Sequence, residues 1–326
     1  MSYDALLIVS FGGPEGMDDV MPFLENVTRG RNVPRERLLS VAHHYELFGG
    51  VSPINQQNRN LIAALKEELR VNGPELPIYW GNRNWHPLLP EALRQMAADG
   101  VSNALAFVTS AYSSFSSCRQ YQQNIAAAQE EVGIATTQIE KLRAFYNHPL
   151  FIEANVDRIR TACAGATPSQ LVFTAHSIPE SMAAHCDYAV QLEEAGRLVA
   201  QELGIEKWNV VYQSRSGSPA QPWLGPDVCD HLRSLSASGV SDVVVAPIGF
   251  VSDHIEVVYD LDVEARQVAD ELGMKLVRAG TAGTHPSFVR MIRELILERV
   301  DNAPARFLGA RGPNHVVCLA DCCLAG

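Results

Sequence analysis

Eight short runs rich in β-forming residues, arranged as two sets of four, constrain the fold more than any other feature of this sequence. They cover residues 5–11, 76–81, 104–110 and 137–142, and then 170–176, 209–214, 242–250 and 274–279. Stretches with helical periodicity separate the runs within each set. Because continuously apolar strands that alternate with helices form parallel sheets covered on both faces, the pattern predicts two α/β layers of doubly wound type.

The interval between the two sets predicts a domain boundary near residue 146. The length of 326 residues suits two domains of ordinary size. We therefore expect domains at residues 1–146 and 147–303. Residues 304–326 lose periodicity and gain Pro, Gly and Cys, which indicates an ordered, Cys-bearing tail. Since ligands of open α/β sheets bind beyond the carboxyl ends of the strands, the cleft between the domains is the expected active site.

Charge and hydropathy exclude several classes of partner. Lys and Arg total 26 against 37 Asp and Glu, and the net charge of -11 repels nucleic acid. No run approaches the ~20 apolar residues needed to cross a bilayer, so any membrane contact is expected to be peripheral. The first residues lack the basic start and long apolar stretch of a signal peptide, and we expect a cytoplasmic protein.

His176 ends an apolar strand in the segment TAHSIPE, where the chain turns at Pro179. A neutral imidazole at that position can accept a proton near physiological pH or bind a metal ion. On this motif alone, a structural role for His176 is as well supported as a functional one.

Glu256, Asp260 and Glu264 recur every four residues in GFVSDHIEVVYDLDVEA and would line one face of a helix. The helix begins directly after an apolar strand, where carboxylates could collect a cation. Such a stripe is often only a solvated helix face. The position favours function for Glu256 and leaves Asp260 and Glu264 evenly balanced.

Two segments offer planar faces and hydroxyl groups suited to a large conjugated ring that carries carboxylates. They are residues 43–53 and residues 110–121. Core packing explains their aromatic residues almost as well. Arg29 and Arg31 could pair with carboxylates of such a ring, and an exposed basic patch is the alternative. FGGPEG at residues 11–16 lacks the spacing of a phosphate loop, so it argues only weakly for a nucleotide.

Three cysteines, Cys318, Cys322 and Cys323, crowd the segment CLADCC near the C-terminus. One more thiolate would complete a four-ligand site for zinc or an iron–sulfur cluster. The alternative is three reduced thiols in a tail.

Six long motifs, taken together and in order, resemble the ferrochelatases across nearly the whole chain. They are LLIVSFGGP, ENVTRGR, HYELFGGVSP, LVFTAHSIPE, YQSRSGSPAQPWLGPDV and PIGFVSDHIEVVYDLD. The resemblance implies the chelatase fold of two Rossmann-like domains, each with a four-stranded parallel sheet. It also implies an enzyme, a lyase that inserts the substrate Fe(2+) into a porphyrin in haem biosynthesis.

The same resemblance implies roles for individual residues. His176 and Glu256 match the residues that bind iron and handle the displaced pyrrole protons, and Asp260 and Glu264 match a row of carboxylates that leads from Glu256. Positions that contact the porphyrin are matched by Ser52, Tyr45, His44 and Tyr121. Phe11 stands where the tyrosine-bearing bacterial enzymes have a ligating side chain, and its ring cannot bind iron.

The tail resembles that of ferrochelatases with a [2Fe-2S] cluster, in which three ligands lie near the C-terminus and one is internal. We expect Cys163 as the fourth ligand beside Cys318, Cys322 and Cys323, with Cys118 and Cys186 as open alternatives. Coproporphyrin III is slightly favoured as substrate over protoporphyrin IX. A cobalt or nickel tetrapyrrole chelatase and a non-enzymatic carrier of haem or an iron–sulfur cluster are the rival functions.

Overall fold

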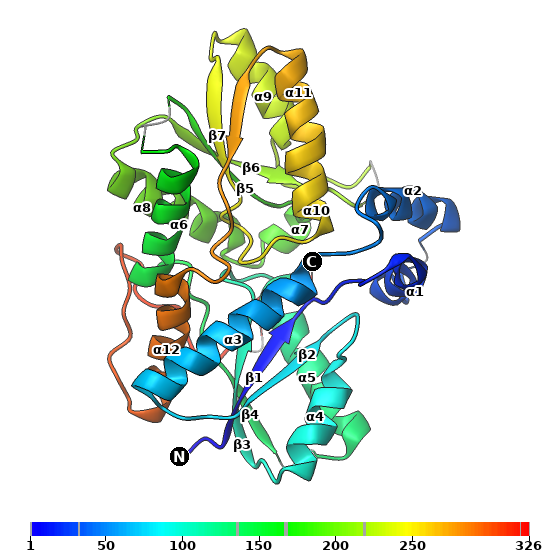
Figure 1. The fold of residues 1–326 in the computed structure, drawn as a ribbon, viewed down its shortest axis with the longest axis vertical. Helices are drawn as coiled ribbons and strands as arrows, with labels where there is room; N and C mark the ends of the chain where they lie inside the picture. The colour runs from blue at the N-terminus through cyan, green and yellow to red at the C-terminus, as the bar shows by residue number, and fades with distance from the viewer. Residues whose placement is uncertain are drawn as a thin grey trace. The chain divides into compact units, whose positions relative to one another are not determined.

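The structure is a computed structural model that describes residues 2–31, 33–134, 137–165, 169–217, 220–319 and 321–325. The chain forms two compact units (Figure 1). The first contains the chain up to Thr109, Tyr121–Leu142 and Ser252–Ile255, and the second contains Ser110–Gln120, Arg143–Val251 and the chain from Glu256 onward. The contacts therefore assign both Ser110–Gln120 and the described part of the tail to the second unit. The predicted division at residue 146 stays a prediction.

A parallel sheet with the strand order β2-β1-β3-β4 forms the centre of the first unit. Its strands are β1 (Ala5–Ser10), β2 (Ile78–Asn82), β3 (Asn103–Val108) and β4 (Gln138–Lys141). Its helices are α1 (Met17–Val27), α2 (Arg35–Glu46), α3 (Ile54–Asn72), α4 (Leu89–Ala98) and α5 (Gln120–Val132). Every residue of β1 is buried, as expected for a central strand covered on both faces.

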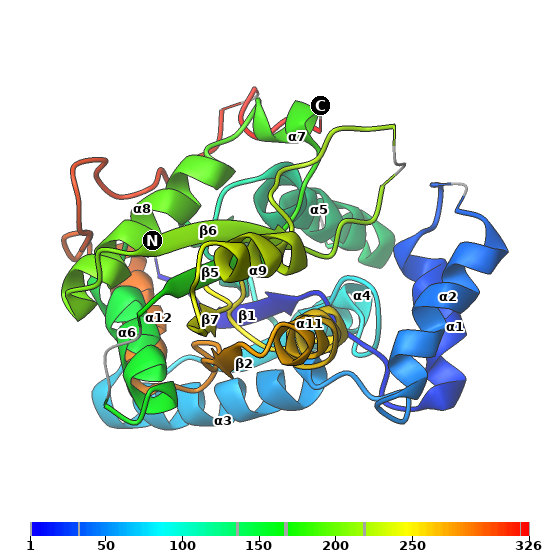
Figure 2. The ribbon, with the colours of Figure 1, turned by 90° about the horizontal axis from the view of Figure 1, so that it is seen from above.

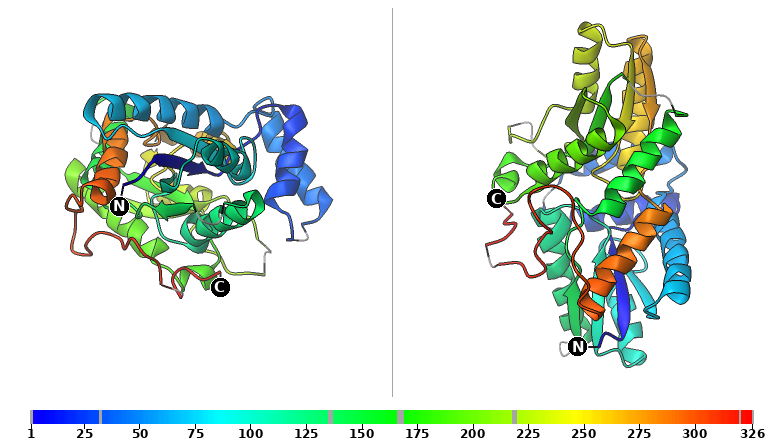
Figure 3. Two further views of the ribbon diagram at one scale, coloured as in Figure 1. Left: turned by 90° about the horizontal axis from the view of Figure 1, so that it is seen from below. Right: turned by 90° about the vertical axis from the view of Figure 1, so that its left-hand side faces the viewer.

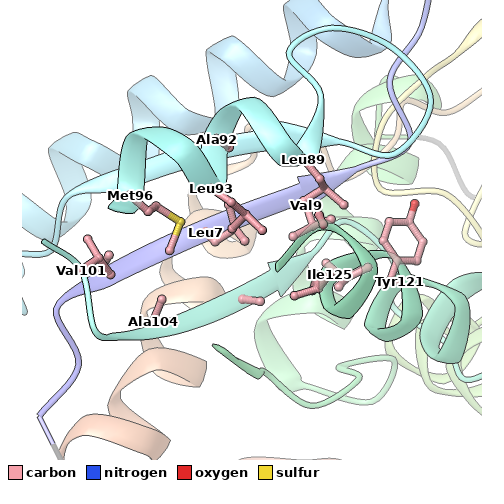
Figure 4. Packing of buried hydrophobic residues seen from close by; sticks show 14 residues of the cluster. Leu7, Val9, Leu89, Ala92, Leu93, Met96, Val101, Ala104, Tyr121 and Ile125 are labelled. Carbon is pink, nitrogen blue, oxygen red and sulfur yellow. The ribbon is translucent and has the colours of Figure 1, made fainter. Parts of the chain in front are cut away.

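The core on one face of this sheet lies under α4 and α5 (Figure 4). Leu89, Leu93 and Met96 recur at helical spacing on α4 and point toward β1. Leu7 and Val9 meet them because alternate residues of a strand face the same side. The apolar periodicity of the sequence thus determines which face of each element is buried.

The second unit repeats the same architecture with the strand order β6-β5-β7-β8, again parallel. Its strands are β5 (Leu171–His176), β6 (Trp208–Gln213), β7 (Asp242–Ala246) and β8 (Lys275–Arg278). Its α-helices are α6 (Pro149–Ala162), α7 (Glu180–Ala183), α8 (Tyr188–Leu203), α9 (Val228–Ala237), α10 (Ile255–Val258), α11 (Ala265–Glu271) and α12 (Pro286–Val300). Two π-helices, η1 (Phe115–Arg119) and η2 (Tyr259–Glu264), complete the described helices.

Helices cover both faces of the second sheet. Residues of α9 and α11 form a core with inward-facing valines of the strands, and α6 and α8 pack together against the strands as a separate pair (Figure 2). Helix α12 packs against α6 (Figure 3). This arrangement confirms the predicted fold class of two four-stranded parallel sheets flanked by helices.

All eight predicted strands are present, with small differences at their ends. The largest concerns residues 242–250, because β7 ends at Ala246. Pro247 follows and has no N–H to donate to a neighbouring strand. Gly249 then passes so close to β5 that a Cβ atom there would lie 2.5 Å from the Cβ of Ala175.

Hydrogen bonds fasten the tail to the second unit. The guanidinium of Arg143 forms two hydrogen bonds with the carboxylate of Glu298 on α12 and donates a third to the carbonyl of Arg306. Asn147 donates to the carbonyls of Leu308 and Gly312, at 3.1 and 2.8 Å. The tail is therefore ordered up to at least this point by buried donors of the preceding segment.

Among the described residues, no helix combines the length and the apolar character needed to cross a membrane.

Candidate active site

In the second sheet, β6 lies on one side of β5, and the chain then crosses to β7 on the other side. The position between β5 and β7 is therefore a topological switch point. Ligands of open parallel sheets bind at such points, beyond the carboxyl ends of the strands. His176 is the last residue of β5, and the segment after β7 leads to Glu256 on α10. The topology therefore brings these two residues to the same edge of the sheet although they are far apart in sequence.

His176 is held in one orientation by its own backbone neighbourhood. Its Nδ1 atom contacts the carbonyl oxygen of Ser177, and the hydroxyl of Tyr188 donates to the carbonyl of His176 at 3.0 Å. Because a carbonyl oxygen only accepts, the proton of a neutral ring lies on Nδ1. Nε2 is then the nitrogen with a lone pair available for a proton or a metal ion.

That Nε2 atom faces Glu256. It lies 3.5 Å from Oε2 of the carboxylate, and 33 % of the His176 side chain and 46 % of the Glu256 side chain are exposed. Burial opposes the charged imidazolium, but the hydrogen bond and the negative charge of Glu256 outweigh it and raise the pKa of His176. The pair can therefore hold a proton between a ring nitrogen and a carboxylate in a place that solvent and a ligand can reach.

Asp260 lies beside this pair, and the pKa of its carboxyl group is raised. Ser214 Oγ and Gln213 Nε2 both donate to its Oδ2, the latter at 3.2 Å. Burial raises the pKa of Asp260 to about 7, and the charges of Glu256 and Glu264 act in the same direction, while the two donors oppose the shift. A carboxyl group with this pKa exchanges its proton near neutrality, as proton-transfer groups in active sites do.

Part of the carboxylate stripe lies on the π-helix η2, whose turns close i→i+5 hydrogen bonds. Asp260 lies close enough to Glu256 and Glu264 for the charges of both to raise its pKa. Glu264 is exposed, accepts a hydrogen bond from Tyr259, and has its pKa raised by burial of the carboxylate and by the charge of Asp227. Single-turn π-helices frequently occur at functional sites.

The predicted ring-contacting residues lie in the first unit, and several are more buried than the sequence suggested. Tyr45 on α2 is 6 % exposed and packs edge-on against Phe23, whose ring also meets Phe11 and Trp85. Ser52 is 3 % exposed, and its backbone N–H donates to the carbonyl of Pro14 at 2.8 Å.

Close packing around Ser52 explains why residue 13 of the FGGP segment is a glycine. A Cβ atom on Gly13 would lie 2.7 Å from the Cβ of Ser52, so the close approach requires glycine. Tyr121 on α5 is also buried, with the guanidinium of Arg83 4.6 Å from its ring centroid.

The remaining predicted contact residues are more accessible. Arg29 and Arg31 are exposed in the turn after α1, and His44 is half-buried on α2. Arg29 lines a cavity of about 520 Å³ together with Trp85 and His86. This part of the first unit therefore has basic side chains that are accessible to a ligand. Tyr45 and Ser52 are buried beneath the surface.

The cysteines divide into a group at the tail and residues elsewhere, and all seven, which lie in the described part of the chain, are without a disulfide bond. The thiols of Cys322 and Cys323 are 3.5 Å apart, and Cys323 is hydrogen-bonded to Cys118 on η1. His315 Nε2 and the thiols of Cys318 and Cys322 lie within 4.8 Å of one another. This group of thiols and one imidazole could hold a metal ion or a cluster.

Cys163 lies apart from this group in its interactions. It follows the last residue of α6, and burial is the cause that raises its pKa. Among the described residues, no hydrogen bond or ion pair joins it to the tail. The structure brings Cys118, one of the open alternatives, to the tail cysteines instead.

Comparison with known proteins identifies the family of the chain. The protein-family model for ferrochelatase matches residues 3–300. The chain is 57 % identical to the ferrochelatase of Rhodopirellula baltica, over 99 % of this chain and 93 % of that protein. The chain belongs to the ferrochelatase family. Its membership confirms the predicted enzyme class, a chelatase that inserts iron into a porphyrin in haem biosynthesis.

Two further relatives carry a more specific name. The chain is 49 % identical to the coproporphyrin III ferrochelatase of Streptomyces griseus, over 99 % of this chain and 94 % of that protein. It is also 49 % identical to the coproporphyrin III ferrochelatase of Nocardia farcinica, over 99 % of this chain and 97 % of that protein.

Solved structures support the fold. The chelatase SirB of Bacillus subtilis with Fe(3+) is similar to this chain with a TM-score of 0.59, over 94 % of this chain and 100 % of that one. At 9 % sequence identity this likeness concerns the fold alone.

Sequence reasoning missed several residues that the structure places next to predicted ones. Gln213 is the last residue of β6 and Ser214 follows it in the motif YQSRSG, so the strand-end rule that identified His176 would have found them. Arg83 gave no signal, because its place beside Tyr121 depends on packing. His315 stands three residues before Cys318, a spacing typical of metal ligands that the cysteine pattern overshadowed.

Proposed function

We propose that this chain inserts ferrous iron into coproporphyrin III and that His176, Glu256 and Asp260 carry the chemistry. The observation that carries the proposal is the pairing of His176 Nε2 with the Glu256 carboxylate at 3.5 Å, next to a carboxyl group whose pKa is about 7. Insertion needs a site that can bind Fe(2+) and accept two pyrrole protons. Nitrogen and oxygen donors whose protons exchange near neutrality meet both needs.

Each group has a separate role in this proposal. His176 Nε2 accepts a pyrrole proton or binds the iron, because Nδ1 is committed to the carbonyl of Ser177. Glu256 stabilises the imidazolium that a proton transfer creates. Asp260 passes the proton on toward solvent, and the exposed Glu264 provides the outer carboxylate of the row. Ferrous iron is a borderline cation that accepts such mixed donors.

The residues of the first unit would hold the macrocycle. Arg29 and Arg31 offer guanidinium groups that pair well with carboxylates, and coproporphyrin III carries more of these than protoporphyrin IX. We propose that His44, Tyr45, Ser52 and Tyr121 line or support the surface that contacts the ring.

The reaction itself separates this proposal from its rivals. Purified protein is mixed anaerobically with Fe(2+) and either porphyrin, and the loss of free-porphyrin fluorescence is followed. Faster turnover with coproporphyrin III supports the substrate assignment, and a preference for protoporphyrin IX overturns it. Preference for Co(2+) or Ni(2+) over Fe(2+) would indicate the rival chelatases, and binding without turnover would indicate a carrier.

The site assignment has its own test. We expect His176→Ala to abolish insertion with little change in thermal stability, because its side chain is partly exposed at the edge of the sheet. His43→Ala is the matched control, since His43 is an exposed histidine whose side chain contacts Glu46. Full activity of His176→Ala would contradict the assignment.

We further propose that the tail binds a [2Fe-2S] cluster, which would supply a redox-active group and a cross-link between the tail and η1. The donor types suit such a group because thiolates hold iron–sulfur clusters, and the thiol of Cys323 lies 3.5 Å from that of Cys322 and is hydrogen-bonded to that of Cys118. Cys318 and His315 lie beside Cys322 as candidates for the fourth position. In this proposal the internal ligand of the cluster is Cys118, where the sequence had suggested Cys163.

The remaining expectations concern the surroundings of the enzyme. We propose a cytoplasmic location, with porphyrin and ferrous iron as partners and with membrane contact, if any, at the periphery. The net charge of -11 argues against a nucleic-acid partner.

A further inference from the structure

Gln213 is a buried amide at the carboxyl end of β6, beside the strand that ends at His176. The two residues are paired in the parallel register of β5 and β6, and the backbone carbonyl of Gln213 accepts a hydrogen bond from the N–H of Ser177 at 2.8 Å. Only 1 % of Gln213 is exposed. A side chain buried to this extent does not meet a porphyrin, so any part that it takes in the reaction is through its neighbours.

The side chain of Gln213 turns its donor end toward the two helices that carry Glu256 and Asp260. Its Nε2 atom donates to Oδ2 of Asp260 at 3.2 Å and to the backbone carbonyl of Glu256 at 3.5 Å. Because a carbonyl oxygen only accepts hydrogen bonds, the amide has to present its NH₂ group at this place. The two hydrogen atoms of that group allow it to serve both oxygens at once.

The other end of the same amide takes no part in these contacts. Oε1 of Gln213 is buried and accepts no hydrogen bond from the residues that the structure describes. The described side-chain hydrogen bonds of Gln213 are therefore both made by Nε2. A methionine has nearly the same length and volume but no N–H group. Gln213→Met thus removes the two contacts and disturbs no further described polar contact of this side chain.

A second donor to Asp260 comes from the next residue of the chain. The hydroxyl of Ser214 also donates to Oδ2 of Asp260. Ser214 has a φ of 59°, in the left-handed region that residues with a Cβ atom rarely adopt. Such backbone positions cluster at functional sites, where the surrounding structure maintains them. The turn that ends β6 thus supplies both donors to Oδ2, and Oδ1 is the Asp260 oxygen that accepts no hydrogen bond from the described residues.

We propose that Gln213 is a positioning residue for iron insertion. It ties the Asp260 carboxylate and the backbone of Glu256 to the end of the sheet at His176, so that the three groups keep one mutual arrangement. The inference rests on the roles proposed above for His176, Glu256 and Asp260. Gln213 acts through these residues and does not touch the substrate. Because its amide is bonded to Oδ2, it leaves Oδ1 of Asp260 as the oxygen that meets a proton or an iron ion.

Positioning matters here because the three groups come from separate elements. His176 is the last residue of β5, whereas Glu256 lies on α10 and Asp260 on η2. Reacting groups have to be held within about 0.5 Å of the productive geometry. Gln213 links the elements, since its carbonyl is bonded to Ser177 and its amide to Glu256 and Asp260. Loss of the amide would release Glu256 and Asp260 from the end of the sheet.

The test removes the donors without changing the length of the side chain. Gln213→Met is assayed anaerobically with Fe(2+) and with coproporphyrin III or protoporphyrin IX, whichever the wild-type protein metallates faster. We expect kcat to fall roughly tenfold or more, because residues that orient metal-binding groups typically change activity by that factor. The KM for the porphyrin should stay within about twofold of the wild-type value, since the side chain is buried away from the ligand. Gln213→Asn keeps the amide but is one methylene shorter, and it should show the same split between kcat and KM.

Gln170→Met is the matched control. Gln170 is 5 % exposed and directly precedes β5, at the amino end of the sheet, where its Nε2 donates to Oδ1 of Asn209 on β6 at 3.0 Å. The control therefore also removes a buried amide donor, but at the edge of the sheet opposite to His176. Its stability cost should be similar, while its kcat should stay close to the wild-type value. Thermal midpoints are measured for all variants, and rates are compared per amount of folded enzyme.

The outcomes separate this inference from the proposal on which it rests. A wild-type kcat in Gln213→Met, or an equal loss of kcat in Gln170→Met, would overturn the positioning role of Gln213. A higher porphyrin KM with unchanged kcat would overturn it as well, since the side chain would then act in binding. Absence of metallation by the wild-type protein would overturn the proposed function and this inference together. Full activity of His176→Ala would overturn the site assignment and, with it, the arrangement that Gln213 is inferred to hold.

Discussion

Asp260→Asn is expected to stabilise the folded protein at alkaline pH while it impairs iron insertion. The folded state holds the proton of Asp260 up to a pKa of about 7, whereas the unfolded chain releases it near the ordinary value of 3.8. Between these values the folded state binds more protons than the unfolded state, so stability falls as the pH rises. Asparagine keeps the shape and an acceptor oxygen for Ser214 but never becomes charged.

The magnitude follows from the shift. A difference of about three pH units corresponds to about 4 kcal/mol at a pH above 7, and this is an upper limit for a fully buried carboxylate. Asp260 is only partly buried and is solvated by two donors, so we expect roughly 1–2 kcal/mol after screening by solvent. For a chain of this size that corresponds to a rise of about 2–6 °C in the thermal midpoint at pH 8.

Thermal unfolding of the wild type and the variant is compared at pH 5 and pH 8 in the presence of a chelator, so that bound metal does not add to stability. We expect the gain from Asp260→Asn to be clearly larger at pH 8. Asp270→Asn on α11 serves as the control, because Asp270 is exposed and its replacement should not produce this pH dependence. An equal effect of Asp260→Asn at both pH values would refute the reasoning.

Three further changes test the packing and the hydrogen bonds around the site. Arg143→Met should lower the free energy of unfolding by about 3–5 kcal/mol, measured by denaturation, because it leaves a buried carboxylate without its partner. Gly249→Ala should cost about 1–3 kcal/mol and reduce iron insertion, since its Cβ would meet Ala175, the residue before His176. Ser214→Ala should move the pH dependence of stability to higher pH, because the lost hydroxyl is a donor that lowers the pKa of Asp260.

Each of these changes has a matched control. Arg233→Met removes an exposed ion pair and should change stability by less than about 1 kcal/mol. Gly16→Ala adds a Cβ where no atom lies within 4 Å, so it should be nearly neutral. A thermal midpoint for Arg143→Met equal to that of Arg233→Met would argue against a structural role for the buried pair, and wild-type behaviour of Gly249→Ala would show that β5 tolerates the added atom. A pH dependence that moves the other way in Ser214→Ala would contradict its assigned contact.

The sequence predicted the sheets because their signal is local. Each strand is a short apolar run that ends at a turn residue. The two sets of four form two sheets, and the order of the strands in one sheet is equivalent to that in the other. The rule that ligands bind at strand ends then pointed to His176 and Glu256, which the structure places 3.5 Å apart. The motifs of the ferrochelatase family led to the same two residues.

The details of the site depended on contacts that local patterns do not encode. A helical stripe of carboxylates was predicted, and part of it lies on the π-helix η2, but the donors to Asp260, Gln213 and Ser214, come from the end of β6 and the residue after it. Burial decides the high pKa of Asp260, and burial depends on neighbours from several elements. For the same reason Tyr45 and Ser52 are buried although their motifs suggested exposed contact residues.

The cysteines show most clearly which features the sequence determines and which depend on the tertiary structure. The sequence by itself determined that three thiols lie within a few residues of one another near the C-terminus, because that proximity is covalent. Only the tertiary structure decided which internal residues join them. Cys118 lies 200 residues before Cys318 and Cys163 only 155 residues before it. It is nevertheless Cys118 that meets the tail, since Arg119 donates to the carbonyl of Cys322, Asn314 donates to Ser113, and Cys323 is hydrogen-bonded to Cys118. Distances between residues far apart in the chain are set by the packing of whole elements, and no local pattern contains them.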